Sequence, residues 1–177
     1  ALAPLTCCQN VGNLQSEAEA MLRAGDYAGA WRQSIAAAQA FEALGDKTNQ
    51  GRSLNTAGAA AAHSGDYTSA LRHMETSLAL ARESGQADLI VTRQNNIAGL
   101  HSMLGNYEDA YARYQDALKS IPEKPANETA VRDRQLTLTN LAILYLQVGQ
   151  NRRALDLYKE ILASPFNFAP SVRAQML

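Results

Sequence analysis

One six-residue phrase occurs three times at a constant interval, and this repetition restricts the possible folds more than any other feature. "GDYAGA" at Gly25–Ala30 returns as "GDYTSA" at Gly65–Ala70 and as "GNYEDA" at Gly105–Ala110. The first glycines of the three copies are 40 residues apart, and a weaker fourth copy begins 44 residues later, at Gly149. A fixed period of this length is typical of proteins that stack one supersecondary unit on the next.

Each of these marker glycines predicts a boundary between two helices. Glycine adopts the left-handed conformation that ends a helix, and the Asp or Asn that follows it is a good N-cap for the next one. A second set of glycines, Gly45 and Gly85, lies halfway between the first three and keeps the same period. Two turns per 40 residues predict a helix–turn–helix unit, in which Asp26, Asp66 and Asn106 cap the second helices.

We therefore expect an all-α fold of antiparallel helix pairs in four repeats, followed by the start of a fifth. Between the third and fourth repeats the turn is "SIPEKPAN", whose two prolines stop the helix and lengthen the spacing. Pro170 is well placed to begin a ninth helix. The expected helices cover about 9–24, 27–44, 47–64, 67–84, 87–104, 107–120, 127–148 and 151–163. The expected division is an N-terminal tail at 1–8 and one solenoid domain at 9–177, with repeats at about 9–46, 47–86, 87–124 and 125–167 and a partial repeat at 168–177.

Residue size also repeats with this period. Small residues fall seven before and five after each marker glycine, where two helix backbones approach closely. Tyrosines occur two and nine after it, where we expect them to fill the space between pairs, although Asn151 and Ser34 stand at these positions in single repeats. The small positions are Ala18, Gly58, Ala98 and Ala142, then Ala30, Ala70, Ala110 and Ala154; the tyrosines are Tyr27, Tyr67, Tyr107, Tyr114 and Tyr158.

Composition argues against several classes of protein. The 177 residues carry a formal net charge of -1 and are 19% charged, which gives no electrostatic reason to bind nucleic acid or an anionic membrane. No apolar run approaches the roughly 20 residues that cross a bilayer. The two cysteines, Cys7 and Cys8, are adjacent, and we interpret them as free thiols, which favours a reducing, cytoplasmic location. An exported form stays open, since Ala1-Leu2-Ala3 is compatible with the end of a removed signal peptide.

The third unit, "NIAGLHSMLGNYEDAYARYQDALKSIP", resembles a tetratricopeptide repeat almost position for position. The resemblance extends over about residues 9–177, and the 40-residue period is similar to a long-helix subgroup. That subgroup includes kinesin light chain, the Leu-Gly-Asn repeat protein, and the arrays of bacterial regulators and CHAT proteases. The resemblance implies a right-handed α-solenoid. The residues that carry it in the third unit are Ile97, Ala98, Gly105, Tyr107, Ala110, Tyr114, Ala117 and Pro122.

The resemblance also implies where a ligand binds. In the family, contacts come from the first helix of each pair, which lines a concave groove. An asparagine amide offers a donor and an acceptor, so it can match the backbone of a peptide of any sequence. The other interpretation is that these are ordinary solvated helix residues. The candidate groove residues are Asn55, Asn95, Asn96 and Asn140, together with Arg52, His63, Thr56 and Thr139.

Two further groups of residues bear on this groove. Four arginines near the starts of first helices either favour an acidic ligand or, as we prefer, pair with surface carboxylates. Three apolar residues of the fourth repeat form either a pocket for an apolar anchor or a face covered by further repeats. The positions that would grip a terminal carboxylate hold no cation. The arginines are Arg52, Arg93, Arg132 and Arg134, and the apolar residues are Leu136, Ile143 and Leu146.

No catalytic pattern is present in the sequence. His63, His73 and His101 have no acidic or cysteine neighbours at ligand spacing, and there is no Gly-rich phosphate loop and no nucleophile elbow. We expect no enzyme activity and no cofactor. The predicted function is a non-catalytic module that binds a peptide or protein segment. The alternative is a regulatory or sensor segment of a larger multidomain bacterial protein, and uncapped repeat ends leave self-association open.

Overall fold

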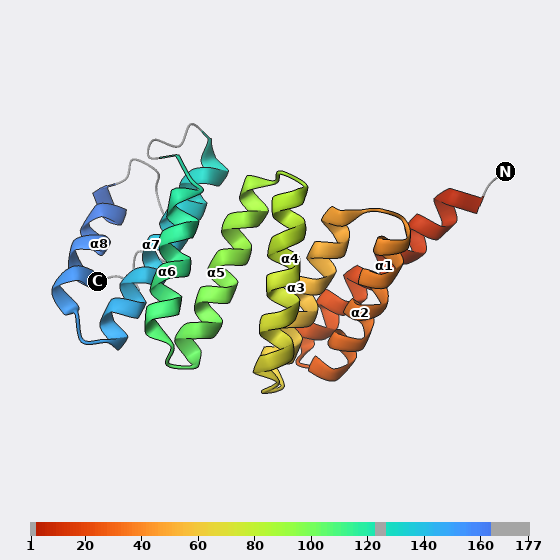
Figure 1. Cartoon of the computed structure of the whole chain (residues 1–177), viewed down its shortest axis with the longest axis horizontal. Coiled ribbons are helices and arrows are strands. Elements are labelled where there is room, and N and C mark those ends of the chain that lie inside the picture. The colour runs from red at the N-terminus through yellow and green to blue at the C-terminus, as the bar shows by residue number, and fades with distance from the viewer. Residues whose placement is uncertain (1–2, 123–126, 164–177) are drawn as a thin grey trace. The chain divides into compact units, whose positions relative to one another are not determined.

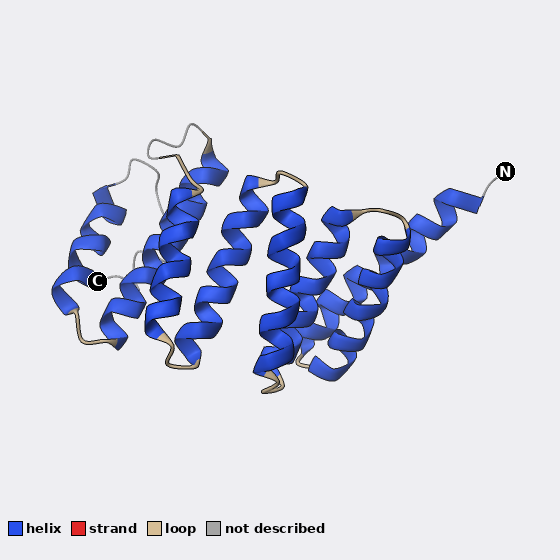
Figure 2. Ribbon diagram, viewed as in Figure 1, coloured by secondary structure: helices blue, strands red, loops and turns tan. Residues whose placement is uncertain are grey.

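The computed structural model describes residues 3–122 and 127–163, and these residues form helices and no strands (Figures 1 and 2). The first helices of the successive pairs are α1, α3, α5 and α7, and the second helices are α2, α4, α6 and α8. Their bounds are α1 Ala3–Ala24, α2 Tyr27–Ala43, α3 Lys47–His63, α4 Tyr67–Glu83, α5 Ala87–Met103, α6 Tyr107–Lys119, α7 Glu128–Gln147 and α8 Asn151–Ala163.

Seven of the eight expected helices are confirmed, with ends within about one residue of the prediction. The exception is α1, which begins at Ala3 instead of near residue 9, so residues 3–8, expected in the tail, are helical. Pro4 is compatible with this early start because a helix tolerates proline in its first turn, where the N–H has no partner. The expected ninth helix from Pro170 lies outside the described residues, and so does the C-terminal stretch 164–177, the repeat end at which self-association stays open.

The turns follow the chemistry that the sequence predicts. Each turn glycine has a positive φ, for example 84° at Gly25. The Asp26 carboxylate then accepts a hydrogen bond from the Gly29 N–H at 2.8 Å, which closes the first turn of α2. Asn106 occupies the same place before α6, but its side chain makes no capping bond. The cap position is therefore predicted correctly there, and the bond is not.

The chain divides into two compact units, residues 1–93 and 94–177. In the first unit, small residues bring α3 and α4 close together. A Cβ on Gly58 would lie 2.7 Å from the Met74 Cγ atom and 3.1 Å from the Ala70 carbonyl oxygen. In the second unit, the core gathers α5, α6 and α7 around Tyr114. The residues of that core cluster are Ala98, Ala110, Tyr114, Leu141 and Leu144.

The repeated tyrosines divide into two kinds. Tyr114, nine residues after its glycine, is buried in the core as expected. Tyr27, two residues after its glycine, is partly buried, and its ring stacks on the His63 ring of the next helix pair. Tyr67 and Tyr107 hold the same position and are more exposed, at 38% and 39%. These rings are available for contacts at the surface.

Candidate functional site

The first helices of the third and fourth repeats, α5 and α7, are joined by two polar contacts. The Asn95 side-chain amide donates to the Thr137 hydroxyl at 2.8 Å, in a buried position. Near the C-terminal ends of the two helices, the Ser102 hydroxyl donates to the Gln147 side-chain carbonyl at 2.6 Å. The two bonds thus link α5 to α7 at the middle and at the C-terminal end of each helix.

Asn95 is consequently part of a helix contact. Its side chain is buried, at 5% exposure, and its carbonyl oxygen has no hydrogen-bond partner among the described residues. The same contact recurs in the first unit, where Gln15 of α1 accepts a hydrogen bond from Ser53 and donates to Thr56 of α3. Asn95 and Gln15 both stand ten residues before a marker glycine. In these two repeats the polar residue at this position therefore joins consecutive first helices.

The remaining groove candidates of the second unit are more accessible. Asn96, Thr139 and Asn140 are each partly exposed, and the Thr139 hydroxyl donates to the Gln135 backbone carbonyl at 2.8 Å. Asn96 and Asn140 hold equivalent positions in consecutive repeats, nine residues before the glycine. They therefore present two amide side chains at corresponding places on neighbouring first helices.

Exposed apolar residues lie on the same two helices as these asparagines. Leu136 and Ile143 flank Asn140 at helical spacing on α7, and Met103 follows Asn96 by two turns on α5. The large apolar residues of α5 and α7 named here are well exposed, for example Met103 at 69% and Leu136 at 53%. We call this surface the second-unit face, and it consists of Asn96, Met103, Leu136, Asn140, Ile143 and Leu146.

The other candidate residues lie in the first unit. Arg52 is exposed, Asn55 is partly buried, and Thr56 is buried in the contact with Gln15. The His63 ring stacks on the Tyr27 ring, with 4.8 Å between the centroids and an angle of 11° between the planes. The groove that the sequence predicts takes residues from both units, and it stays a prediction.

The arginines differ from one another in their surroundings. Arg132 pairs with Glu128 one turn away, as expected, while Arg134 pairs at 3.1 Å with Glu160 of α8, a partner that the sequence did not indicate. Burial, reinforced by Arg52, lowers the pKa of Arg93 to about 10, and Asp88 acts in the opposite direction. Arg93 therefore stays protonated at neutral pH. The ion pairs of Arg132 and Arg134 lie at the surface, so they contribute little to the stability of the fold.

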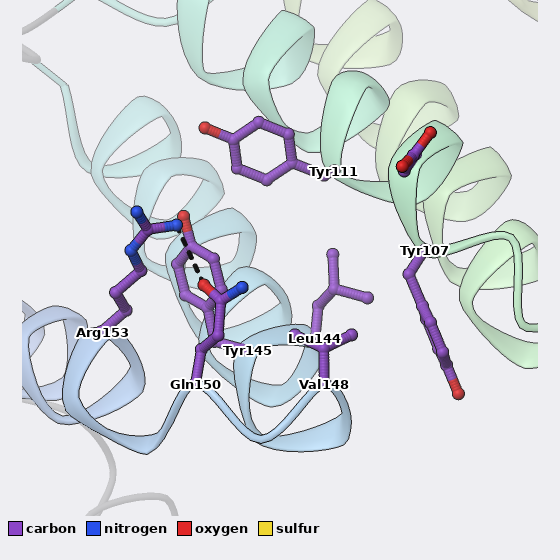
Figure 3. Close-up of a pocket in the computed structure, with 8 residues that line it drawn as sticks. Tyr107, Tyr111, Leu144, Tyr145, Val148, Gln150 and Arg153 are labelled. Atoms are coloured by element: carbon purple, nitrogen blue, oxygen red, sulfur yellow. Dashed lines mark hydrogen bonds between the residues drawn. The ribbon is translucent and has the colours of Figure 1, made fainter.

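A pocket that the sequence analysis missed lies where α6 begins and α7 ends (Figure 3). Its volume is about 290 Å³, and three tyrosines contribute to its walls. In the sequence, the signal for this pocket is the repeated phrase, because Tyr107 and Glu108 belong to "GNYEDA". The lining residues from α7 and α8 are distant in sequence from this phrase, and their spacing does not associate them with it. The lining residues are Tyr107, Glu108, Tyr111, Leu144, Tyr145, Val148, Gln150 and Arg153.

No group of three or more His, Cys, Asp or Glu side chains in the described part of the chain is arranged to hold a metal ion. Among the described helices, none combines the length and apolar character needed to cross a membrane.

Comparisons with known proteins agree with this architecture. Two family models, both described as tetratricopeptide repeat, match residues 50–123 and 137–167, which together make up more than half of the chain. A similar solved structure is the crystal structure of BtubC (BKLC) from P. vanneervenii. It matches with a TM-score of 0.80 and 19% sequence identity over 98% of this chain and 71% of that one. This likeness concerns the fold alone, and no curated protein sequence matches at a significant level.

Proposed function

Because the chain belongs to the tetratricopeptide-repeat family, we propose that it is a non-catalytic interaction module whose second-unit face binds an extended peptide segment of a partner protein. Repeats of this family generally mediate protein–protein interaction. The single observation that carries the proposal is the exposed apolar and amide surface on α5 and α7. Surfaces of this kind are common at sites where proteins associate.

The chemistry of the face suits an extended peptide. The amides of Asn96 and Asn140 can each donate to a backbone carbonyl and accept from a backbone N–H, whatever the side chains of the ligand. Leu136, Ile143 and Leu146 offer apolar surface between which alternate side chains of the ligand can pack. We therefore expect a ligand with apolar residues at alternating positions and little preference for charge.

Selection of displayed random peptides on the intact chain tests this proposal. Enriched peptides are synthesised, and their affinities are measured for the wild type and for Asn96→Ala and Asn140→Ala. Each substitution removes an amide that bonds the ligand, so we expect at least about a fivefold weaker affinity, the equivalent of one ordinary hydrogen bond. Asn106→Ala is the control for loss of an asparagine outside the face, since the Asn106 side chain is exposed and makes no capping bond.

The result that would overturn the proposal is equally clear. If the selected peptides bind both asparagine variants as tightly as the wild type, the second-unit face is not the binding surface. A thermal unfolding curve for each variant separates lost contacts from lost structure.

A further inference from the structure

The tyrosine-lined pocket lies on a different side of α7 from the second-unit face. Leu144 and Val148 are one helical turn apart and face the pocket, whereas Leu136 and Ile143 project about a third of a turn away. The start of α6 forms the opposite side, and the start of α8 closes one end. The pocket is therefore a separate feature of the second unit, and the proposed function does not account for it.

Its interior is apolar and its rim is aromatic. Leu144 is buried beneath the opening, while Tyr107, Tyr111 and Val148 are exposed around it. The rings of Tyr111 and Tyr145 approach with 6.2 Å between centroids and a tilt of 44°. Aromatic rings at such distances attract one another edge to face, and the ring of a ligand can make the same interaction with these two tyrosines.

One cation is held at the edge of the pocket. The Arg153 guanidinium carbon lies 5.7 Å from the centroid of the Tyr145 ring, and one Nη1–H donates to the Gln150 side-chain carbonyl at 2.9 Å (Figure 3). A guanidinium carries five N–H donors, so this bond leaves capacity to bind an anion. On the α6 side of the pocket lies the carboxylate of Glu108, which repels an anionic group of a ligand.

We propose that this pocket receives one aromatic side chain of a partner protein, and that an acidic residue next to it in the partner pairs with Arg153. The volume of about 290 Å³ is at the lower end for small-molecule sites but sufficient for a single aromatic ring. A buried aromatic anchor in a small apolar pocket, with a charged contact beside it, is the usual composition of an interface hot spot. The charges at the rim select the acidic neighbour, because only the α8 side is cationic.

The test uses the intact chain and defined dipeptides. N-acetyl-Phe-Asp-amide is titrated to about 10 mM, which detects dissociation constants in the millimolar range, while the methyl NMR signals of Leu144 and Val148 are followed. We expect saturable shifts at both residues. We expect at least tenfold weaker binding of N-acetyl-Ala-Asp-amide, which lacks the ring, and of N-acetyl-Phe-Lys-amide, which reverses the charge.

Three variants complete the experiment. Tyr111→Ala should abolish the shifts, and the exposed Arg153→Gln should weaken binding of the Asp dipeptide to the level of the Lys dipeptide. Tyr67→Ala is the control for Tyr111→Ala, since the two tyrosines are exposed to nearly the same degree, 38% and 42%, and Tyr67 lies outside the pocket. It should change nothing.

Several outcomes would overturn this inference. Flat titrations, equal shifts from the alanine dipeptide, or unchanged binding to Tyr111→Ala would each exclude an aromatic anchor in this pocket. Methyl shifts that follow protein concentration without any dipeptide would show a second copy as the occupant instead. Asn96→Ala and Asn140→Ala should leave dipeptide binding unchanged, so failure of the proposed function is distinguishable from failure here.

Discussion

Individual caps at the helix starts differ in a way that stability measurements can detect. Asp26 bonds the Gly29 N–H, whereas Asn106 makes no side-chain bond at the equivalent position. We predict that Asp26→Ala lowers the free energy of unfolding by about 1 kcal/mol. Asn106→Ala should change it by no more than about 0.5 kcal/mol. Urea unfolding followed by circular dichroism measures both, and equal losses would contradict the assignment of the caps.

The buried Tyr114 phenol makes the fold sensitive to alkali. Burial raises the pKa of Tyr114 to about 12 from its ordinary value of 10.0. Since the unfolded chain loses this proton more readily, the stability from Tyr114 is fully present below pH 10 and declines as the pH rises toward 12. We predict that Tyr114→Phe makes the melting temperature fall less steeply over this range.

Tyr67→Phe provides the comparison for that measurement. Its ring is exposed, so the substitution should leave the alkaline decline of the wild type unchanged. The test is to measure the melting temperatures of the wild type, Tyr114→Phe and Tyr67→Phe at several pH values between about 9 and 12. Parallel curves for the wild type and Tyr114→Phe would show that the phenol is not the titrating group.

At the scale of the helix pair, close approach of backbones sets what each position tolerates. Gly58 leaves no room for a methyl group, because the Ala70 carbonyl and Met74 lie against it. We predict that Gly58→Ala destabilises the chain by about 1–3 kcal/mol. Gly12, in the interior of α1, has nothing within 4 Å of an added Cβ. Gly12→Ala should therefore stabilise by about 0.4–1 kcal/mol. Two changes of the same sign in thermal melts would contradict the packing described for α3 and α4.

Contacts between consecutive first helices are also separable from ligand contacts. Asn95→Ala removes the buried bond to Thr137, and we predict a loss of about 1–3 kcal/mol in the free energy of unfolding. Asn140→Ala, at a partly exposed position, should change stability by no more than about 0.5 kcal/mol. Chemical unfolding of the two variants measures the difference. Equal stability losses would show that Asn95 is not a structural residue.

For the whole molecule, the turns were predictable because their chemistry is local. A glycine followed by Asp or Asn ends one helix and starts the next without reference to distant residues, so the starts of α2, α3, α4 and α6 follow from the sequence alone. The site was less predictable. Asn95 and Asn96 are adjacent and alike in sequence, yet one is buried against Thr137 and the other is partly exposed. Which of two neighbours faces the next helix depends on the packing of α5 on α7, and that information is not local.

The pocket shows the same limit. Tyr107, Tyr145 and Arg153 come from three helices, and nothing in their spacing associates them. The repeated phrase predicts the turn at Tyr107, and the tertiary fold determines what that ring meets. The resemblance of the third unit to a tetratricopeptide repeat predicted the family, which the matches at residues 50–123 and 137–167 confirm.

The central claim is that the second-unit face binds the partner, and a pair of matched leucines tests it most directly. Leu136 on that face is 53% exposed, and Leu155 on α8, outside the face, is 52% exposed. The affinity of the selected peptides is measured for Leu136→Glu and Leu155→Glu by isothermal titration calorimetry. The account predicts at least a tenfold loss for Leu136→Glu, because a carboxylate replaces an apolar contact, and no change for Leu155→Glu. Equal affinities for the two variants would contradict it.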